Sequence, residues 1–218
     1  MRKTAHPSLP GALWQPGDPL FDTEQQWPTK SSQQVYDDGF VTVRVDAVRS
    51  PGGETFDRSV VEHPGAVGVL AIDDAERVLL LRQYRHAARR RLLELPAGIC
   101  DVAGEAPTAT AARELHEEAS LRALDWRPLL DVVPTPGSTN ERWQVYLARD
   151  LRPVAEHERH EPQHEEADMT AVWVPLDEVA AAILSRRLTD AMAGIAVLAA
   201  IVLRAGPGLD SLTAISGH

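Results

Sequence analysis

A cluster of carboxylates on one short predicted helix constrains this chain more than any other feature. Residues three or four positions apart share a helix face, so Glu114, Glu117 and Glu118 crowd their charges together. Each like-charged pair costs about 0.2–0.5 kcal/mol if nothing lies between the carboxylates. A hard divalent cation would turn this repulsion into binding, because Mg²⁺ prefers carboxylate oxygens and leaves positions for water and phosphates. The pattern predicts a metal site, and its alternative is a solvated acidic helix face.

The residues on either side of these carboxylates define the ends of the helix. Gly98 opens a loop that carries Glu105, and we expect the helix to run over 107–120, with a proline tolerated in its first turn. Ser120 stands near the C-terminal end, where glycine adopts positive φ readily and serine pays a steric cost. The loop and the helix therefore form one continuous candidate site.

Charge and apolar runs limit the class of protein. The 218 residues carry a formal net charge of −10, which argues against a general nucleic-acid surface, so we expect no nucleic-acid partner. The strongest apolar run, 191–203, is shorter than the roughly 20 residues that span a bilayer. We expect this run to form a buried or interface helix, and we expect no membrane partner.

The cysteine content and the N-terminal sequence bear on the compartment. Cys100 is the only cysteine, so there is no internal disulfide framework, and no continuous apolar segment of a secretory signal begins the chain. We therefore expect a cytoplasmic protein. No arrangement of cysteine with histidine indicates a nucleophile, so Cys100 is expected to be a buried or incidental thiol.

Strand and turn patterns organise the chain around one central helix. Alternating segments flank the turn at 50–53 and predict a hairpin, and apolar segments on both sides of 73–76 predict another. Two helices follow the last strand, near 176–186 and 189–204. Strands around one helix, with further helices later, predict a mixed α/β fold, an α/β/α sandwich with a mixed sheet.

We expect four parts along the chain. The parts are an irregular arm (1–33), an N-terminal strand region (34–63), the main domain (64–206) and a frayed tail (207–218). The arm is proline-rich, and its Trp14 and Trp27 are either packing anchors or stacking partners for a ligand.

The stretch from Gly98 to Leu121 resembles the Nudix box, which runs glycine, five residues, glutamate, seven residues, Arg-Glu-apolar-x-Glu-Glu-x-Gly-apolar. The matching residues are Gly98, Glu105, Arg113, Glu114, Leu115, Glu117, Glu118 and Leu121. The chain differs from the box in two places. Six residues separate Gly98 from Glu105, and Ser120 replaces the last glycine. The extra residue falls in the loop, where insertions are tolerated. The spacing into the helix is intact, so the carboxylates keep their register.

Sequence outside the box is similar to the ADP-ribose pyrophosphatase branch of the Nudix hydrolases over about residues 35–205, and closest to its actinobacterial members. The similarity lies in VVEHPGAVGVLAIDD, RQYRH, LLELPAG, PGSTNE and HEEADM. It implies a Nudix-type α/β/α sandwich and a homodimer that exchanges its N-terminal strands. It also implies metal-dependent hydrolysis of the diphosphate of a nucleoside diphosphate derivative, foremost ADP-ribose to AMP and ribose 5-phosphate.

The expected metal is Mg²⁺, with Mn²⁺ as a substitute. Its expected ligands are the main-chain carbonyl of Ala97 and the carboxylates of Glu114, Glu117 and Glu118. Arg113 is expected to hold these glutamates in place by ion pairing. The resemblance implies a glutamate from a later loop as the general base, and this residue is Glu166, with Glu165 as the fallback.

Four residues are expected to bind the substrate: Arg85, Glu94, Gly98 and Glu141. Arg85 ends a predicted buried strand and could fork onto a diphosphate, whereas the following Arg89–Arg91 fit a solvated loop. Glu94 lies in an apolar strand and must be paired or solvated, so a ribose, a metal and a dimer partner all stay open as its contact.

Three further alternatives stay open. His157, His160 and His164 could suggest zinc, but they lie in a polar loop without paired thiols, which favours a solvated loop. The substrate could be another nucleoside diphosphate sugar, a dinucleotide or an oxidised nucleoside triphosphate. A protein that binds a nucleotide without cleaving it is the alternative to an enzyme, and the intact set of box glutamates disfavours it.

Overall fold

The computed structural model describes residues 4–39, 41–160 and 168–215. The chain divides into two compact units, Met1–Ser32 with Asp46–Arg58 and Gln33–Val45 with Ser59–His218. The boundary cuts across a sheet of order β1-β2-β3, whose strands are β1 (Thr29–Asp37), β2 (Thr42–Arg49) and β3 (Thr55–Glu62). The hairpin predicted around 50–53 is confirmed as the pairing of β2 with β3.

Phe56 is the centre of the aromatic contacts in the smaller unit. The edge of Trp27 meets its ring at a centroid distance of 6.4 Å, and the Arg58 guanidinium lies 4.3 Å from the ring centroid. Trp14 is more exposed and donates its indole N–H to the Asp18 carbonyl at 3.1 Å. Trp27 thus packs against Phe56 in the described structure, and its stacking on a ligand stays a prediction.

Two sheets form the framework of the larger unit. The first has the order β7-β4-β9-β8, with strands β4 (Ala66–Ala71), β7 (Ala97–Ile99), β8 (Leu121–Val132) and β9 (Trp143–Pro153). Because β4 runs parallel to β9 and antiparallel to β7, this sheet is mixed, as predicted. The second has the order β10-β5-β6, with strands β5 (Arg77–Arg85), β6 (Arg90–Glu94) and β10 (Thr170–Pro175).

The hairpin predicted around 73–76 is wrong in its pairing. The turn itself forms, with the Glu76 N–H donating to the Asp73 carbonyl at 3.0 Å, and Ile72 bridges Val78. Beyond this bridge β4 pairs with β7 and β9, whereas β5 pairs with β10 and β6. Both strands are largely buried, and a continuous apolar pattern does not tell which neighbours a buried strand takes.

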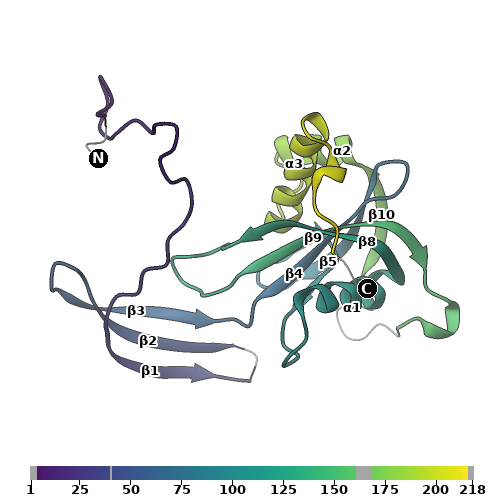
Figure 1. Cartoon of the computed structure of the whole chain (residues 1–218). Helices are drawn as coiled ribbons and strands as arrows, with labels where there is room; N and C mark the ends of the chain where they lie inside the picture. The colour runs from purple at the N-terminus through teal and green to yellow at the C-terminus, as the bar shows by residue number, and fades with distance from the viewer. Residues whose placement is uncertain (1–3, 40, 161–167, 216–218) are drawn as a thin grey trace. The chain divides into compact units, whose positions relative to one another are not determined.

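Helices α1 (Pro107–Ala119) and α3 (Ala191–Ala205) pack against the first sheet, whereas α2 (Leu176–Leu184) packs against α3 and against β5 and β10 of the second sheet (Figure 1). Successive side chains of a strand point to opposite faces. On β4, Val67 and Val69 pack in one cluster with Leu115 of α1, whereas Leu70 packs in another with Val197 of α3. The helices therefore lie on both faces, and the predicted α/β/α sandwich is confirmed.

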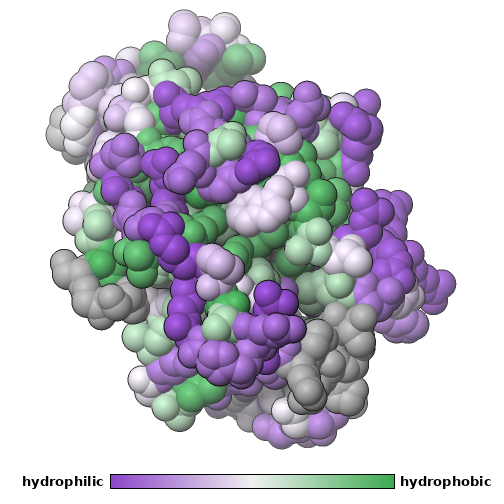
Figure 2. All heavy atoms as spheres, turned by 90° about the vertical axis from the view of Figure 1, so that its right-hand side faces the viewer, coloured by the Kyte–Doolittle hydropathy of each residue, from purple (hydrophilic) through white to green (hydrophobic). Residues whose placement is uncertain are grey.

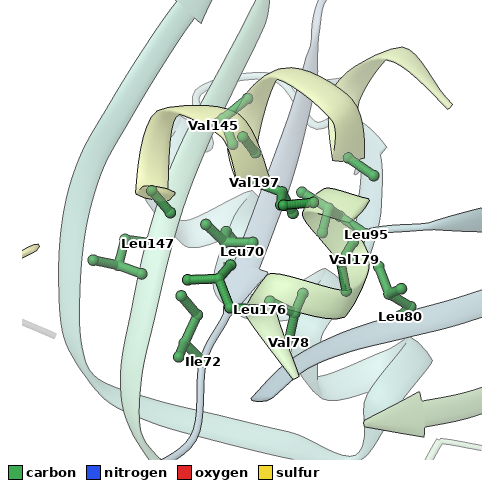
Figure 3. Close-up of a cluster of buried hydrophobic side chains, with 14 of the residues drawn as sticks. Leu70, Ile72, Val78, Leu80, Leu95, Val145, Leu147, Leu176, Val179 and Val197 are labelled. Atoms are coloured by element: carbon green, nitrogen blue, oxygen red, sulfur yellow. The ribbon is translucent and has the colours of Figure 1, made fainter. Parts of the chain in front are cut away.

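The larger cluster fills the space beneath α2 and α3. Figure 3 shows its members Leu70, Ile72, Val78, Leu80, Leu95, Val145, Leu147, Leu176, Val179 and Val197. Burying one such side chain stabilises the fold by about 1.5–3 kcal/mol. This core holds β4, β6 and the start of α3 in place, and all three border the candidate site.

The apolar run 191–203 forms most of α3, and Ala193, Ala196 and Ala200 on it are fully buried. The buried helix expected there is confirmed. No helix in the described residues is both long enough and apolar enough to cross a membrane. On the face seen in Figure 2, hydrophilic side chains surround smaller hydrophobic areas.

Candidate active site

Arg113 binds the carboxylates that α1 brings together. Its Nη1 lies 2.7 Å from Glu114 Oε1 and 3.2 Å from Glu117 Oε2, and its Nη2 lies 3.2 Å from Glu105 Oε2. Glu105 also accepts a hydrogen bond of 2.9 Å from the Thr110 hydroxyl. The guanidinium thus offsets the repulsion expected on this helix face, and it joins the loop residue Glu105 to the helix.

The short strand β7 contacts the glutamates of α1. Its Ala97 N–H donates to Glu118 Oε2 at 2.9 Å. At Gly98 an added Cβ would lie 2.1 Å from both Cδ and Oε1 of Glu114, so only glycine leaves room for that carboxyl group. Ala97 and Gly98 therefore position two of the glutamates on α1.

Ser120 ends α1 in the left-handed region, with φ 52° and ψ 42°. Its N–H donates to the His116 carbonyl at 3.0 Å, which closes the last turn before β8 begins. The position near the helix C-terminus is as predicted, and the positive φ is the conformation in which a serine side chain is expected to be strained. The replacement of the box glycine thus affects the helix end and leaves the carboxylate register intact.

A cavity of about 470 Å³ opens beside β7 and is lined by Arg85, Glu94, Gly98 and Glu141, the four residues predicted to bind substrate. It lies within the usual range of ligand pockets, about 300–1,000 Å³. Its other lining residues are His63, Ala66, Ala87, Ala88, Leu92, Leu95, Ala97, Ile99, Trp143, Asp190 and Met192. The fold thus places the four residues around one cavity, next to the glutamates of α1.

Arg85 and Glu94 form a bidentate ion pair on neighbouring strands. Arg85 Nε lies 3.0 Å from both carboxylate oxygens of Glu94, and Nη2 lies 2.7 Å from Oε2. Glu94 is 7% exposed, and the Arg85 side chain is 44% exposed. Glu94 was expected to be either paired or solvated, and it is paired. The ion pair fixes the Arg85 guanidinium at the cavity wall.

The loop before β9 carries Glu141 into the cavity. The indole N–H of Trp143 donates to Glu141 Oε1 at 2.7 Å, and His63 Nε2 lies 3.8 Å from the same oxygen. The His63 N–H donates to Asn140 Oδ1 at 2.8 Å, which ties this loop to the end of β3. His63 and Trp143 were not predicted as site residues, although His63 lies within VVEHPGAVGVLAIDD and Trp143 closely follows PGSTNE, two stretches that carry the family resemblance.

Asp190 is a third lining residue that sequence reasoning missed. It caps α3, where its Oδ2 accepts the Ala193 N–H at 2.8 Å, and it faces the cavity that holds Arg85 and Glu94. An aspartate directly before an apolar helical run is a sequence signal for a helix N-cap. That signal locates the helix start, but only the packing of α3 places the residue in the cavity.

Burial and charge shift the acidity of several groups here. Burial raises the pKa of Glu114, and the nearby Glu117 charge adds to this while Arg113 opposes it. Hydrogen bonds from Arg113 and Thr110 hold the pKa of Glu105 below its ordinary value. Burial also raises the pKa of the Cys100 thiol, which favours the protonated form over the reactive thiolate.

Both candidates for the general base, Glu166 and Glu165, lie outside the described residues. His164 lies outside them too. His157 and His160 lie within the described range. No group of three or more histidine, cysteine, aspartate or glutamate side chains in the described residues, the glutamates of α1 included, is arranged as a ready-made metal site. The zinc alternative stays untested, because His164 lies outside the described residues.

The donor set on α1 and β7 fits a hard divalent cation by its chemistry. Glu114, Glu117 and Glu118 would offer carboxylate oxygens and the main chain of Ala97 a carbonyl, and the missing side chain of Gly98 leaves space beside Glu114. In the described arrangement Arg113 engages two of the three carboxylates. The charge that a metal ion would neutralise is thus partly neutralised by Arg113.

Comparisons with known proteins identify the family of this chain. The NUDIX domain matches residues 62–193, and the nucleoside diphosphate sugar hydrolase N-terminal domain matches residues 27–61. The chain is 45% identical over 183 residues to the ADP-ribose pyrophosphatase of Mycobacterium tuberculosis (strain ATCC 25618 / H37Rv), covering 84% of this chain and 87% of the relative.

Two more distant likenesses extend the comparison. A CMP-5'-(N-acetyl-N-hydroxy-3-aminopropyl)phosphonate hydrolase of Streptomyces rubellomurinus (strain ATCC 31215) is 34% identical over 178 residues, covering 82% of this chain and 84% of the relative. The crystal structure of an ADP compounds hydrolase matches with a TM-score of 0.71 at 21% identity, covering 86% of this chain and 99% of that one. The latter supports the fold alone.

The chain belongs to the Nudix family. It is a hydrolase that acts on phosphoanhydride bonds, in ADP-ribose or related nucleoside diphosphate derivatives. Nudix hydrolases generally use divalent metal ions, in keeping with the oxygen donors on α1 and β7.

Proposed function

We propose that this enzyme hydrolyses ADP-ribose to AMP and ribose 5-phosphate, with Mg²⁺ as its metal and Mn²⁺ as a substitute. The observation that supports this most directly is the cavity in which Arg85, Glu94, Gly98 and Glu141 meet beside the carboxylates of α1. The 45% identity to an ADP-ribose pyrophosphatase supports the choice of substrate.

The reaction adds one water across the diphosphate. The water oxygen bonds to one phosphorus, the bridging oxygen leaves with the other phosphate, and we assign the proton of the water to Glu166, or to Glu165 if that residue is the base. Mg²⁺ bound by Glu114, Glu117, Glu118 and the Ala97 carbonyl would neutralise phosphate charge and lower the pKa of water.

The other site residues position these groups. Arg113 holds Glu114 and Glu117 in place through the contacts described above. Arg85, held by Glu94, keeps a positive charge at the cavity wall, where a diphosphate oxygen would accept from it. Glu141, fixed by Trp143, supplies an acceptor for a sugar hydroxyl.

Replacing Glu118 by glutamine tests the metal assignment. Glutamine keeps an oxygen that can accept the Ala97 N–H, so the fold should survive, while turnover of ADP-ribose to AMP should nearly vanish. The matched control is Glu178→Gln on the exposed side of α2, which should keep full activity. Full activity of Glu118→Gln in chromatographic product assays would refute the assignment.

The two candidates for the base are separated by the same assay. Glu166→Gln should slow turnover without weakening metal binding, whereas Glu165→Gln should have the smaller effect. The reverse order would move the general base to Glu165. Metal binding is followed independently by calorimetry, so a loss of metal and a loss of base are distinguished.

A second substrate class is favoured by one comparison. A relative at 34% identity is named a hydrolase of a CMP-linked phosphonate, so a cytidylyl derivative is the alternative to ADP-ribose. A panel of ADP-ribose, other nucleoside diphosphate sugars, a dinucleotide, an oxidised nucleoside triphosphate and a cytidylyl substrate decides between them. The substrate with the highest kcat/KM identifies the class.

We further propose a cytoplasmic homodimer that exchanges its N-terminal strands. The match of residues 27–61 to the nucleoside diphosphate sugar hydrolase N-terminal domain supports the role of this region, and the single cysteine suits a reducing compartment. Light scattering measures the mass, and cell fractionation measures the location. A monomeric mass for the full chain would refute the dimer.

A further inference from the structure

A second cavity of about 230 Å³ lies in the larger unit, and five arginines line it: Arg82, Arg90, Arg91, Arg186 and Arg187. The other lining residues are Leu92, Leu93, Leu188 and Thr189. The arginines come from β5, β6 and the loop between α2 and α3, and no carboxylate is among the lining residues. We call this space the arginine cavity.

The arginine cavity contrasts with the chain as a whole, whose net charge is −10. Elsewhere arginines bind carboxylates, as Arg77 binds Asp73 and Arg127 binds Asp125. In the arginine cavity, Arg91 binds Asp168. A concave surface lined by one sign of charge concentrates its field, which attracts ions of the opposite sign.

The remaining four arginines have few partners among the residues that the structure describes. Arg187 Nε donates to the Ser185 hydroxyl at 2.9 Å. The side chains of Arg82, Arg90 and Arg186 form no hydrogen bond or ion pair with other described residues. Their mutual repulsion is therefore not offset by carboxylates in the described part of the chain, and a bound anion would offset it.

The size of the cavity limits its ligand. Its volume is below the roughly 300–1,000 Å³ of pockets that enclose drug-sized ligands, so it suits a few linked phosphates better than a whole nucleotide. Arginine matches phosphate in shape, because its planar fork donates two parallel hydrogen bonds to the oxygens. The acidic character of the whole chain speaks against an extended nucleic acid as the occupant.

The arginine cavity is next to the candidate active site but separate from it. Leu92 lines both cavities, while none of the five arginines lines the cavity that holds Arg85 and Glu94. The same two segments build both spaces, because β6 also carries Glu94 and the α2–α3 loop ends at Asp190. An anion that joins Arg90 and Arg186 would therefore hold together two segments that also border the substrate cavity.

We propose that the arginine cavity binds a compact di- or triphosphate group, as a site distinct from the one that cleaves the substrate. The group can be free or the end of a nucleotide. Binding draws β6 and the α2–α3 loop together through their arginines. This proposal does not depend on which diphosphate the enzyme hydrolyses.

The experiment measures calorimetric binding of inorganic tripolyphosphate and, separately, of ATP to the full chain in EDTA, where metal-dependent turnover is suppressed. Saturable binding is expected, and Arg186→Gln with Arg187→Gln should weaken it about tenfold or more, since each hydrogen bond to a charged group contributes substantially. The tighter of the two ligands shows whether the site takes a free or a nucleotide-bound group. Hydrogen exchange of residues 90–94 and 185–190 should slow when the ligand is bound.

Two controls make the result specific. Arg122→Gln with Arg152→Gln removes the same charge from exposed positions paired across β8 and β9, and it should keep the wild-type affinity. Arg85→Gln should also keep it. A second cavity variant, Arg82→Gln with Arg90→Gln, replaces the first if that one does not fold.

Three outcomes would overturn the proposal. The first is an absence of saturable binding to the wild-type chain. The second is an equal loss of affinity in the Arg122 and Arg152 control, which would indicate an effect of net charge alone. The third is a loss of affinity in Arg85→Gln with none in the cavity variants, which would place the anion in the candidate active site.

Discussion

The carboxyl group of Glu114 rests directly on Gly98, so closely that an added Cβ there would lie 2.1 Å from its Cδ and Oε1. The contact joins the helix that carries the acidic cluster to the strand that borders the substrate cavity. It explains in physical terms why a glycine opens the motif, since any side chain on this strand position would occupy the place of the carboxylate.

Gly98→Ala should therefore abolish most of the activity while leaving the fold intact. The Glu114 carboxyl group is the end of a flexible side chain and can move, at a cost of about 1 kcal/mol in rotamer strain. A displacement of about 1 Å in a catalytic group can lower turnover about 100-fold. Steady-state kinetics and urea unfolding measure the two effects.

The control for this variant is Gly194→Ala, inside α3, where an added Cβ meets no atom within 4 Å. Alanine there should raise the free energy of unfolding by about 0.5–1 kcal/mol and leave kcat unchanged. Unchanged activity of Gly98→Ala would contradict the role given to the Glu114 contact.

Arg113→Gln should lower the free energy of unfolding by about 1–3 kcal/mol, because it leaves three partly buried carboxylates without their cation. Urea denaturation monitored by circular dichroism measures this. Arg122→Gln, at an exposed position with one ion pair, should change it by less than about 1 kcal/mol. Equal effects of the two substitutions would show that the network does not stabilise the fold.

Ser120→Gly should stabilise the protein by about 1 kcal/mol, since glycine adopts the φ of 52° found at this helix end without steric strain. Ser120→Ala keeps a Cβ and should bring no such gain. The comparison is made by thermal unfolding of the three proteins at equal concentration. A glycine variant no more stable than the alanine variant would argue against strain at this position.

Asp190→Asn should flatten the dependence of stability on pH. Burial raises the pKa of Asp190 in the folded state, and the nearby Glu94 charge adds to this. The folded protein then binds the proton at a higher pH than the unfolded chain, so this group adds stability as the pH falls from above the raised pKa toward the unfolded value, about 3.9. Asparagine does not titrate and removes this contribution.

The cap on α3 provides the control for that experiment. Asparagine still accepts the Ala193 N–H, whereas Asp190→Ala loses this bond and should cost about 1 kcal/mol at every pH. Urea unfolding between pH 7 and pH 4 separates the two effects. Parallel pH profiles for the wild type and Asp190→Asn would contradict the raised pKa.

Local features of this chain followed from its sequence. The spacing of Arg113, Glu114, Glu117 and Glu118 predicted one helix face, and the helix ends at Ser120 with the positive φ expected there. The apolar run 191–203 predicted the buried helix α3. Each of these depends on neighbours within a turn or two of the chain, where periodicity and steric rules apply directly.

Relations between distant segments needed the tertiary structure. An apolar pattern on β4 and β5 showed that both are buried, but it did not show that they separate into different sheets. The sequence also did not show that Asp190 lies beside Glu94 in the substrate cavity, or that Arg82 and Arg186 line the arginine cavity together. The two members of each pair lie about 100 residues apart in sequence. The sequence by itself thus determined the acidic helix face and the glycine before it. The cavities beside this face were decided by how the core packs β6 against the start of α3, because long-range packing has no local signature in the sequence.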